Sequence, residues 1–281
     1  MTAGLSSEAR IGITGARGIL GSRIAEACGA LRYNPVPYGG DVRDGAALTA
    51  WVKDLDAVVH AAAVVPVSVV EADPGNAIAV NVGGTAAVAR AAADRDLPFT
   101  YVSTSHVYEP SSDPLVEGSS LRPVNKYGLT KLQGEAWCEV LHSSPLLVRV
   151  FSFFDARQPE PYLVPTLRRR VAETGHGQEL AVHSAGSTRD LADASWMATA
   201  IARLVAAGAT GRVNCATGVA VPVADVARAV AAAQGRHDVR VVDATPGRQD
   251  HLVADTTLLR HLIPDLRPFD LSQALTGLCR D

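Results

Sequence analysis

Several features that mark particular classes of protein are scarce in this sequence. Lysine occurs only three times among 281 residues and the net charge is −3, so we expect neither nucleic acid nor an anionic membrane as a partner. The longest apolar run, residues 58–70, is too short to span a bilayer. The first ten residues lack the apolar core of a signal peptide. These absences predict a cytoplasmic protein that binds no membrane.

Cysteine is also rare. The four cysteines are Cys28, Cys138, Cys215 and Cys279, and their spacing matches no set of metal ligands. We therefore expect free, mostly buried thiols in a reducing compartment, and no metal site.

The residues that are abundant alternate in a regular way. Short runs rich in valine, isoleucine and aromatic residues predict strands at residues 10–14, 57–63, 99–104 and 146–151. Longer alanine-rich stretches with helical periodicity predict helices at residues 19–30, 75–95 and 125–141. Strands that are apolar on both faces and alternate with helices indicate an α/β fold, a Rossmann-type doubly wound parallel sheet.

The pattern loosens after Phe154. Further strands are predicted at residues 176–183 and 211–217, Pro222 opens a helix, and Asp255 caps a later one. We divide the chain into a dinucleotide-binding domain and a smaller C-terminal substrate-binding lobe. The first takes residues 1–155 and 188–217, and the second takes residues 156–187 and 218–281. The proline-rich stretch at residues 109–123 is expected to frame the substrate mouth.

A glycine-rich loop follows the first predicted strand. In the segment TGARGILG, Gly15 permits a tight turn, Gly18 lets the backbone approach a pyrophosphate, and Gly21 lets helix and strand pack closely. The N-terminus of the following helix offers free N–H groups to that pyrophosphate. The strand–loop–helix context predicts dinucleotide binding.

The choice between NADP(H) and NAD(H) depends on two residues. Asp41 lies 20 residues after Gly21, where a carboxylate could hold the adenosine ribose, although it could instead meet the adenine. In the second case no carboxylate guards the 2′ position, and Arg17 in the glycine loop could take a 2′-phosphate. We prefer NADP(H), with Arg17 as a solvated loop residue the alternative.

Tyr127 and Lys131 lie four residues apart in a predicted helix, so their side chains share one face. A phenol has a pKa of about 10, and a neighbouring ammonium group stabilises phenolate and lowers that pKa. Thr104 and His106 lie two residues apart at the end of a predicted strand and project together. These four residues predict a site for proton transfer.

Six segments, in this order, carry a family resemblance: TGARGILG, GDVRD, HAAA, NVGGT, VSTSHVY and YGLTK. With them the chain resembles the extended short-chain dehydrogenase/reductase superfamily. Within it, the chain is most similar to the NAD(P)-dependent epimerase/dehydratase family acting on nucleotide sugars. The resemblance covers residues 1–155 and continues more loosely through residues 188–195 and 246–259.

The resemblance implies a role for each matching residue. Tyr127 would be the general acid/base, Lys131 would anchor the nicotinamide ribose, and Thr104 would hydrogen-bond the reacting oxygen. The implied cofactor-binding residues are Gly15, Arg17, Gly18, Ile19, Leu20, Asp41, Val42, Ala61, Ala62, Ala63, Asn81, Tyr127 and Lys131. The implied substrate-binding residues are Thr104, Ser105, His106, Arg189 and Arg248. The two arginines would meet a diphosphate, or else form surface ion pairs.

Departures from the family pattern narrow the reaction. Dehydratases of the family carry Thr-Asp-Glu where this chain has Thr104, Ser105 and His106, which argues against dehydration. His106 stands where GDP-fucose synthases have a reactive cysteine. Histidine suits proton transfer near neutral pH, so His106 either positions or protonates substrate, or it supports the loop.

The sequence therefore predicts an NAD(P)-dependent oxidoreductase that reduces a keto group on a nucleotide-diphospho-sugar of the 4-keto-6-deoxyhexose type. Alternatives are an NAD-dependent nucleotide-sugar 4-epimerase, a ketoreductase for a non-nucleotide natural product, and a non-enzymatic dinucleotide-binding redox sensor. The resemblance also implies a homodimer, in which helices at residues 75–95 and 125–141 pack as a four-helix bundle.

Overall fold

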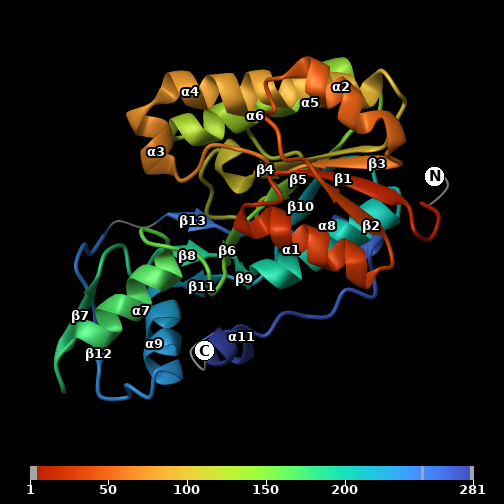
Figure 1. Cartoon of the computed structure of the whole chain (residues 1–281). Coiled ribbons are helices and arrows are strands. Elements are labelled where there is room, and N and C mark those ends of the chain that lie inside the picture. Colours follow the sequence, from red (N-terminus) through yellow and green to blue (C-terminus); the bar gives the residue numbers. More distant parts are fainter. Residues whose placement is uncertain (1–4, 248–249, 279–281) are drawn as a thin grey trace.

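The centre of the molecule is a six-stranded sheet in which each strand pairs in parallel with its neighbours (Figure 1). The computed structural model describes residues 5–247 and 250–278. In spatial order the strands are β10 (Gly211–Cys215), β5 (Leu146–Val150), β4 (Phe99–Thr104), β3 (Ala57–His60), β1 (Arg10–Thr14) and β2 (Asn34–Pro37). The order reverses between β1 and β3. Ligands of such sheets bind outside the carboxyl ends of the strands at this switch point.

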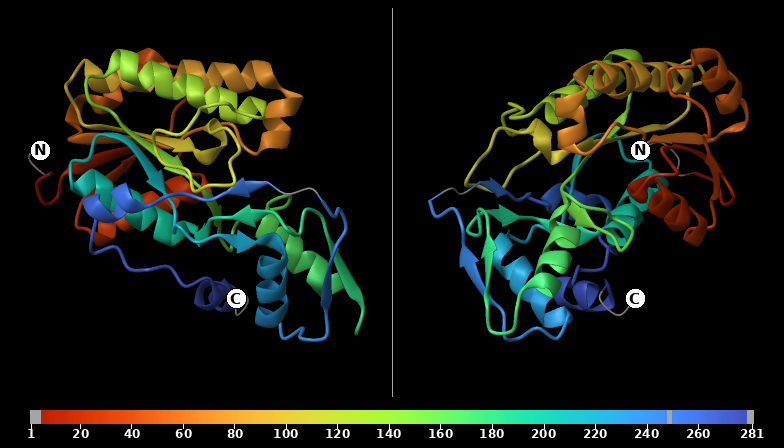
Figure 2. Two further views of the ribbon diagram at one scale, coloured as in Figure 1. Left: turned by 180° about the vertical axis from the view of Figure 1, so that it is seen from behind. Right: turned by 60° about the vertical axis from the view of Figure 1, so that its left-hand side comes forward.

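Helices cover both faces of the sheet (Figures 1 and 2). One face carries α1 (Ile19–Ala30), α8 (Ala194–Ala206) and α10 (Thr257–Leu262). The other carries α2 (Gly45–Trp51), the 3₁₀ turn η1 (Val52–Asp54), α3 (Val67–Ala72), α4 (Pro74–Ile78), α5 (Thr85–Ala93) and α6 (Lys126–Leu141). The fold is the predicted Rossmann-type doubly wound α/β sheet.

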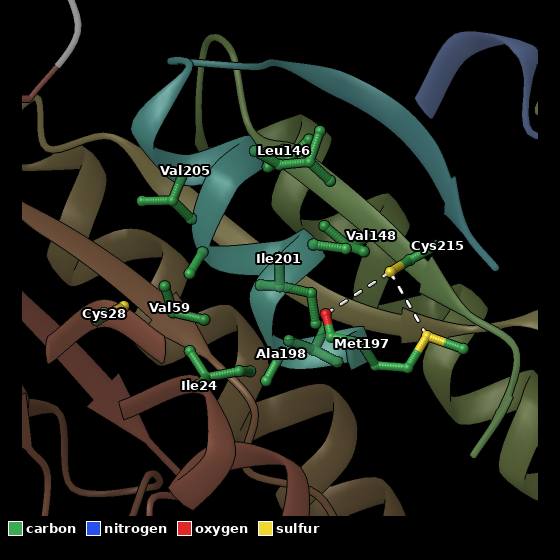
Figure 3. Packing of buried hydrophobic residues seen from close by; sticks show 14 of the residues in the cluster. Ile24, Cys28, Val59, Leu146, Val148, Met197, Ala198, Ile201, Val205 and Cys215 are labelled. Atoms are coloured by element: carbon green, nitrogen blue, oxygen red, sulfur yellow. Dashed lines mark hydrogen bonds between the residues drawn. The ribbon is translucent and has the colours of Figure 1, made fainter. Parts of the chain in front are cut away.

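The main core forms because strand side chains alternate between the two faces. In β3, Val58 joins the cluster beneath α2, α5 and α6, whereas Val59 joins the cluster beneath α1 and α8. Figure 3 shows the second cluster, in which Ile24 of α1 and Ile201 of α8 lie near Val59. Two buried thiols also lie there, Cys28 and Cys215, and Cys138 is buried in the first cluster. All three are free, as expected, and Cys279 lies outside the described residues.

The predicted elements are present with two changes. The strand predicted to reach residue 63 ends at His60, because residues 61–63 leave the sheet and line a cavity. The helix predicted over residues 75–95 consists of α4, the π-helix η2 (Ala79–Gly84) and α5. The prediction missed several elements, among them β2, α2 and α8. Strand β2 has the sequence NPVP, and its prolines are tolerated because β2 lies at the edge of the sheet.

A second, smaller layer lies beside the sheet (Figure 2). Its core is formed by α7 (Leu163–Glu173), β7 (Glu179–Val182), α9 (Val223–Ala233), β12 (Arg240–Asp243) and α11 (Leu271–Leu278). Short pairings connect it to the main sheet: β6 (Ser152–Phe154) with β9 (Leu191–Asp193), and β8 (Thr188–Arg189) with β11 (Val221–Pro222) and β13 (His251–Leu252). Helix α10 differs, because Leu259 and Ile263 belong to the core of the main sheet.

Two details of the C-terminal half follow the sequence closely. Pro222 is the N-cap residue of α9, one position before the first-turn place predicted for it. Helix α10 has Thr256 at its N-cap, but the Asp255 Oδ1 accepts a hydrogen bond from the Thr257 N–H at 2.8 Å. Within the described ranges, no helix is both long and apolar enough to cross a membrane.

Candidate active site

One cavity of about 1060 Å³ lies at the carboxyl ends of the central strands. It extends from the glycine loop after β1 to the smaller layer, where Leu163 and Val164 form part of its wall. Fourteen predicted site residues line it: Gly15, Arg17, Gly18, Ile19, Leu20, Ala61, Ala62, Ala63, Thr104, Ser105, His106, Tyr127, Lys131 and Arg189. The cavity therefore brings the predicted cofactor residues and the predicted catalytic residues into one site.

The glycine loop provides a cradle that a side chain would fill. Gly15 has a φ of +71°, and a Cβ atom there would lie 2.6 Å from the Ala62 backbone nitrogen. A Cβ atom on Gly21 would lie 2.2 Å from the Gly15 carbonyl oxygen. Helix α1 has Gly18 at its N-cap and no side-chain cap, so its first N–H groups and its positive dipole end are available to an anion. These features fit the pyrophosphate of a dinucleotide.

A chain of buried hydrogen bonds supports this loop from below. Thr85 donates to the Asn81 carbonyl oxygen at 2.7 Å, so its oxygen accepts from the Nε2–H of His60 at 3.0 Å. The His60 Nδ1 then accepts from the Thr14 hydroxyl at 2.6 Å, and Thr14 accepts from the Ala62 N–H at 3.3 Å. Burial, followed by the charge of Lys131, lowers the pKa of His60 to about 3. A neutral histidine thus ties together the carboxyl ends of β1 and β3.

Three predicted cofactor residues lie outside the cavity wall. The Asp41 carboxylate accepts two hydrogen bonds from the Arg43 guanidinium, and this contact lowers the pKa of Asp41 to about 2. Val42 is buried in the core against Gly84. Asn81 is fully buried: its Oδ1 accepts from the Val64 N–H at 2.7 Å, and its Nδ2 donates to the Thr130 hydroxyl at 3.1 Å.

The Asn81 contacts reach the helix that carries Tyr127. Thr130 donates in turn to the Tyr127 carbonyl oxygen at 2.8 Å. Val64 precedes the cavity-lining residues Val65 and Pro66. Asn81, in the π-helix η2, therefore connects one wall of the cavity to α6. π-Helical turns are frequent at functional sites, and no sequence pattern indicated this one.

Burial dominates the electrostatics of Tyr127 and Lys131. It raises the pKa of Tyr127 to about 12, although a hydrogen bond with the Thr104 side chain opposes the rise. It lowers the pKa of Lys131 to about 7, and the Lys131 Nζ lies over the Tyr101 ring, 4.1 Å from the centroid. The influences on the Tyr127 phenol are burial, Thr104 and Tyr162, so the lowering expected from the Lys131 ammonium group does not set its pKa. Tyr127 therefore keeps its proton at neutral pH.

Arg189 lies at the far side of the cavity in an ion pair. Its Nη2 is 3.0 Å from the Asp250 Oδ2, and its Nη1 donates to the Thr188 carbonyl oxygen at 2.9 Å. About a quarter of its side chain, 24 %, is exposed. Arg189 is therefore positioned to meet an anionic group that displaces Asp250. Arg248 lies outside the described residues.

A buried ion pair holds together the elements that carry the predicted catalytic residues. The Arg149 Nη2 donates to the Glu135 Oε2 at 2.7 Å, and the Glu135 Oε1 accepts from the Arg149 Nε at 3.0 Å. Ser103 also donates to that Oε1, at 2.5 Å. Glu135 lies one turn after Lys131, and Ser103 precedes Thr104. The pair therefore fixes α6 against the ends of β4 and β5.

The sequence interpretation missed much of the cavity wall. The missed residues include Val65, Pro66, Gln158, Tyr162 and Leu163. Tyr162 is close enough to Tyr127 to contribute to the raised pKa of that phenol. Leu163 begins α7 and the others come from loops, and none belongs to a motif, so no sequence signal pointed to them. The stretch at residues 109–123, expected at the mouth, contributes no residue to the cavity wall.

Comparison with known proteins identifies the family. The model of the RmlD substrate binding domain matches residues 9–253. The chain belongs to this family. The resemblance to the extended short-chain dehydrogenase/reductase superfamily is thereby confirmed.

Curated relatives of this RmlD-family chain match about half of its length. Methionine adenosyltransferase 2 subunit beta of Xenopus tropicalis is 33% identical over 144 residues, which cover 47% of this chain and 42% of that protein. The probable low-salt glycan biosynthesis reductase Agl14 of Haloferax volcanii is 30% identical over 173 residues, covering 61% of this chain and 57% of that one. The chain thus spans between two fifths and three fifths of these relatives.

Solved structures share the whole fold of this RmlD-family chain. RMD from Pseudomonas aeruginosa, complexed with NADPH, has a TM-score of 0.85 and 20% identity, covering 97% of this chain and 98% of that one. A dTDP-4-dehydrorhamnose reductase from Clostridium acetobutylicum has a TM-score of 0.84 and 21% identity, covering 96% and 98%. Other solved structures with this fold hold NADP or NAD.

Proposed function

We propose that the protein is an NAD(P)-dependent oxidoreductase that reduces a keto group on a nucleotide-diphospho-sugar, with Tyr127 as the general acid. The observation that carries the proposal is the convergence of Thr104, Tyr127 and Lys131 on a cavity that also holds the glycine loop. Family membership and the solved nucleotide-sugar enzymes of the same fold support the substrate class.

A bound dinucleotide supplies the hydride. The protein supplies orientation and the proton. The glycine loop and the uncapped end of α1 would hold the pyrophosphate, and Lys131 would hold a ribose hydroxyl. Tyr127, protonated at neutral pH, would donate to the carbonyl oxygen as charge develops on it, and the Thr104 hydroxyl would steady that oxygen.

NADP(H) is the proposed cofactor. Asp41 is the carboxylate that could compete with a 2′-phosphate, and its charge is paired with Arg43. Arg17 is exposed in the glycine loop, lines the cavity and forms no ion pair within residues 5–247 and 250–278. It is therefore available to a 2′-phosphate.

Two other functions have a specific observation in their favour. A 4-epimerase is supported by the fold of UDP-N-acetylglucosamine 4-epimerase from Methanobrevibacter ruminantium. A dinucleotide-binding subunit of another enzyme is supported by the relatives named methionine adenosyltransferase 2 subunit beta. Tightly retained NAD would favour the epimerase. Full biological activity of a Tyr127→Phe variant would favour the subunit.

The test is turnover of dTDP-4-dehydrorhamnose and of other keto and non-keto nucleotide sugars. The oxidation of NADPH or NADH measures this turnover. We expect NADPH-dependent reduction of a keto sugar. Tyr127→Phe should lower kcat by about 10²- to 10⁴-fold while NADPH still binds. A variant with unchanged kcat would contradict the role of Tyr127. If no keto sugar is reduced, a non-nucleotide carbonyl substrate becomes the better hypothesis.

A further inference from the structure

Asn125 uses both ends of its side-chain amide immediately before α6. Its Oδ1 accepts from the Gly128 backbone N–H at 2.8 Å and caps the helix. A backbone N–H can only donate, so this contact fixes which end of the amide is oxygen. The Nδ2 end therefore faces the imidazole of His106, whose Nδ1 lies 2.9 Å away.

The second contact fixes the position of the proton on His106. An amide NH₂ donates and does not accept, so the His106 Nδ1 must be unprotonated to accept from it. The single proton of the neutral ring then resides on Nε2. Burial, followed by the positive charge of Arg189, lowers the pKa of His106, which keeps the ring neutral at pH 7.

The Nε2–H group is left without a protein acceptor among residues 5–247 and 250–278. The contacts of the ring are the Asn125 hydrogen bond and an edge-on arrangement with the Tyr127 ring, with centroids 5.8 Å apart and planes at 73°. His106 lines the cavity together with Thr104 and Tyr127. An oriented donor without a partner beside the general acid is suited to a ligand oxygen.

We propose that Asn125 holds His106 as the neutral Nε2–H tautomer, and that this N–H binds an acceptor oxygen of the substrate beside the reacting carbonyl. The inference rests on the proposed function for the identity of the ligand. It replaces proton transfer by His106 with a fixed hydrogen bond: the ring keeps its proton, and Tyr127 alone delivers one. Asn125 is then a positioning residue, acting through His106.

The tautomer can be read directly without substrate. Imidazole nitrogens of protein labelled with ¹⁵N-histidine report whether each carries a proton, and the signal absent from His106→Gln identifies His106. We expect an unprotonated Nδ1 and a protonated Nε2 at pH 7 and above. The opposite tautomer in the wild-type protein would overturn the proposal, whatever the enzyme does.

An Asn125→Asp variant reverses the direction of the hydrogen bond with His106 and keeps the helix cap on Gly128. Aspartate caps a helix as well as asparagine does, so the melting temperature should remain close to that of the wild type. Its carboxylate can only accept, so at high pH it draws the single proton of His106 to Nδ1 and leaves Nε2 without one. Substrate should then lose one hydrogen bond, and kcat/KM should fall about tenfold.

The variant should also acquire a pH dependence. On lowering the pH, a doubly protonated His106 regains its Nε2–H, so kcat/KM should recover relative to the wild type. The other groups facing the ring are Arg189 from β8, Asp250 before β13 and Tyr127 from α6. They are unchanged in both proteins and do not account for a difference between them. An Asn125→Asp variant with the wild-type pH profile would overturn the proposal.

The matched control is His106→Gln, whose amide nitrogen can donate from nearly the same place. Its own kcat/KM is the reference, and adding Asn125→Asp to it should have no further effect on kcat/KM, because the imidazole through which Asn125 acts is absent. The substrate is the nucleotide sugar turned over by the wild type, with NADPH. Only this proposal predicts that Asn125→Asp has no effect on kcat/KM once His106 is replaced. An active Tyr127→Phe variant would contradict only the proposed function.

Discussion

At the scale of single residues, burial sets the protonation of the proposed catalytic groups. Tyr127 is held neutral, because its phenol would be charged only after losing a proton in a desolvated site. Lys131 is 2 % exposed, and its pKa of about 7 lies well below the ordinary 10.5. A proton donor must carry its proton before the reaction, so the raised pKa of Tyr127 suits reduction.

The burial of Lys131 should lower the folding stability of the protein, a cost that comes with its proposed function. Its pKa is about 7 in the folded chain and near 10.5 when unfolded, so between these pH values the unfolded chain binds more protons. Folding stability therefore rises with pH through this window. Lys131→Met should raise the free energy of unfolding by about 1–4 kcal/mol below pH 7, with the gain shrinking as the pH approaches 10.5. Denaturant melts across this pH range measure the effect.

Lys126→Met is the control for that experiment. Lys126 is half exposed and paired with Glu71, so its loss should change the free energy of unfolding by less than about 1 kcal/mol. The wild type and Lys131→Met should also differ in turnover, because Lys131 would hold the ribose. If the wild type and Lys131→Met had equal free energies of unfolding at every pH, this would contradict a buried, neutral Lys131 amine.

Arg17 provides a separate test of the cofactor. Arg17→Ala should weaken NADPH binding about tenfold and leave NADH binding nearly unchanged, because NADH has no 2′-phosphate for it to meet. Arg90→Ala, on the exposed side of α5, is the control and should affect neither. Titration of dinucleotide fluorescence measures both affinities. Equal losses for the two dinucleotides would place Arg17 away from the 2′ position.

At the scale of elements, the approach of α6 to the end of β4 defines the site. The 3₁₀ turn η3 (Ser105–Val107) follows β4, and a Cβ atom on Gly128 would lie 2.2 Å from the His106 carbonyl oxygen. This distance is far shorter than van der Waals contact, and the atom that the added carbon would meet belongs to the backbone. Only glycine lets α6 lie this close to η3.

Gly128→Ala should therefore displace the first turn of α6 and with it Tyr127. We expect kcat to fall by about 10- to 100-fold, since small misplacements of catalytic groups cost that much, together with a lower melting temperature. Gly29→Ala in α1 is the matched control, because no atom lies within 4 Å of the added carbon. That variant should be as active as the wild type and slightly more stable.

The elements that sequence predicted well are those with uninterrupted patterns. The strand at residues 10–14 and the helix at residues 19–30 have the predicted bounds, because apolar periodicity and a glycine loop act locally. Strand β2 was missed since its prolines hide a strand that only an edge position allows. The π-turn in residues 79–84 depends on Asn81 bonding to distant Val64 and Thr130, which no local pattern reveals.

The candidate site divides in the same way. Most motif-bearing positions between the glycine loop and Lys131 were predicted and lie together in the cavity, whereas Val42 and Asn81 are buried outside its wall. Asp41 was placed by its distance in sequence from Gly21, but its pairing with Arg43 depends on side-chain geometry. Tyr162 and Gln158 approach the cavity only through packing of the smaller layer. The spacing of residues along the sequence does not encode these long-range packing contacts.

At the scale of the whole molecule, one helix face lacks a covering layer. Leu129, Trp137 and Val140 lie on one side of α6 and are 48%, 46% and 74% exposed. Ile78, at the end of α4, is 52% exposed. These side chains fall on the two helical segments proposed to form a four-helix bundle, so we propose a second copy of this chain as their partner.

Trp137→Glu should convert this homodimer to a monomer, because a charge would be buried against its symmetry mate. Sedimentation analysis of the two proteins at equal concentration measures the change. Val219→Glu, an exposed valine outside α4 and α6, is the control and should leave the dimer intact. A wild-type protein that sediments as a monomer at every concentration would contradict the proposed partner.

The turn η3 is held by its backbone, and its residues Ser105 and His106 line the cavity. Gly128 packs against the His106 carbonyl group, and the His106 N–H donates to the Thr104 hydroxyl at 3.3 Å. Exchanging the side chain at position 105 or 106 therefore alters what the ligand meets and leaves the scaffold in place. Divergence in sugar preference should accordingly concentrate at positions 105 and 106, whereas position 128 requires glycine.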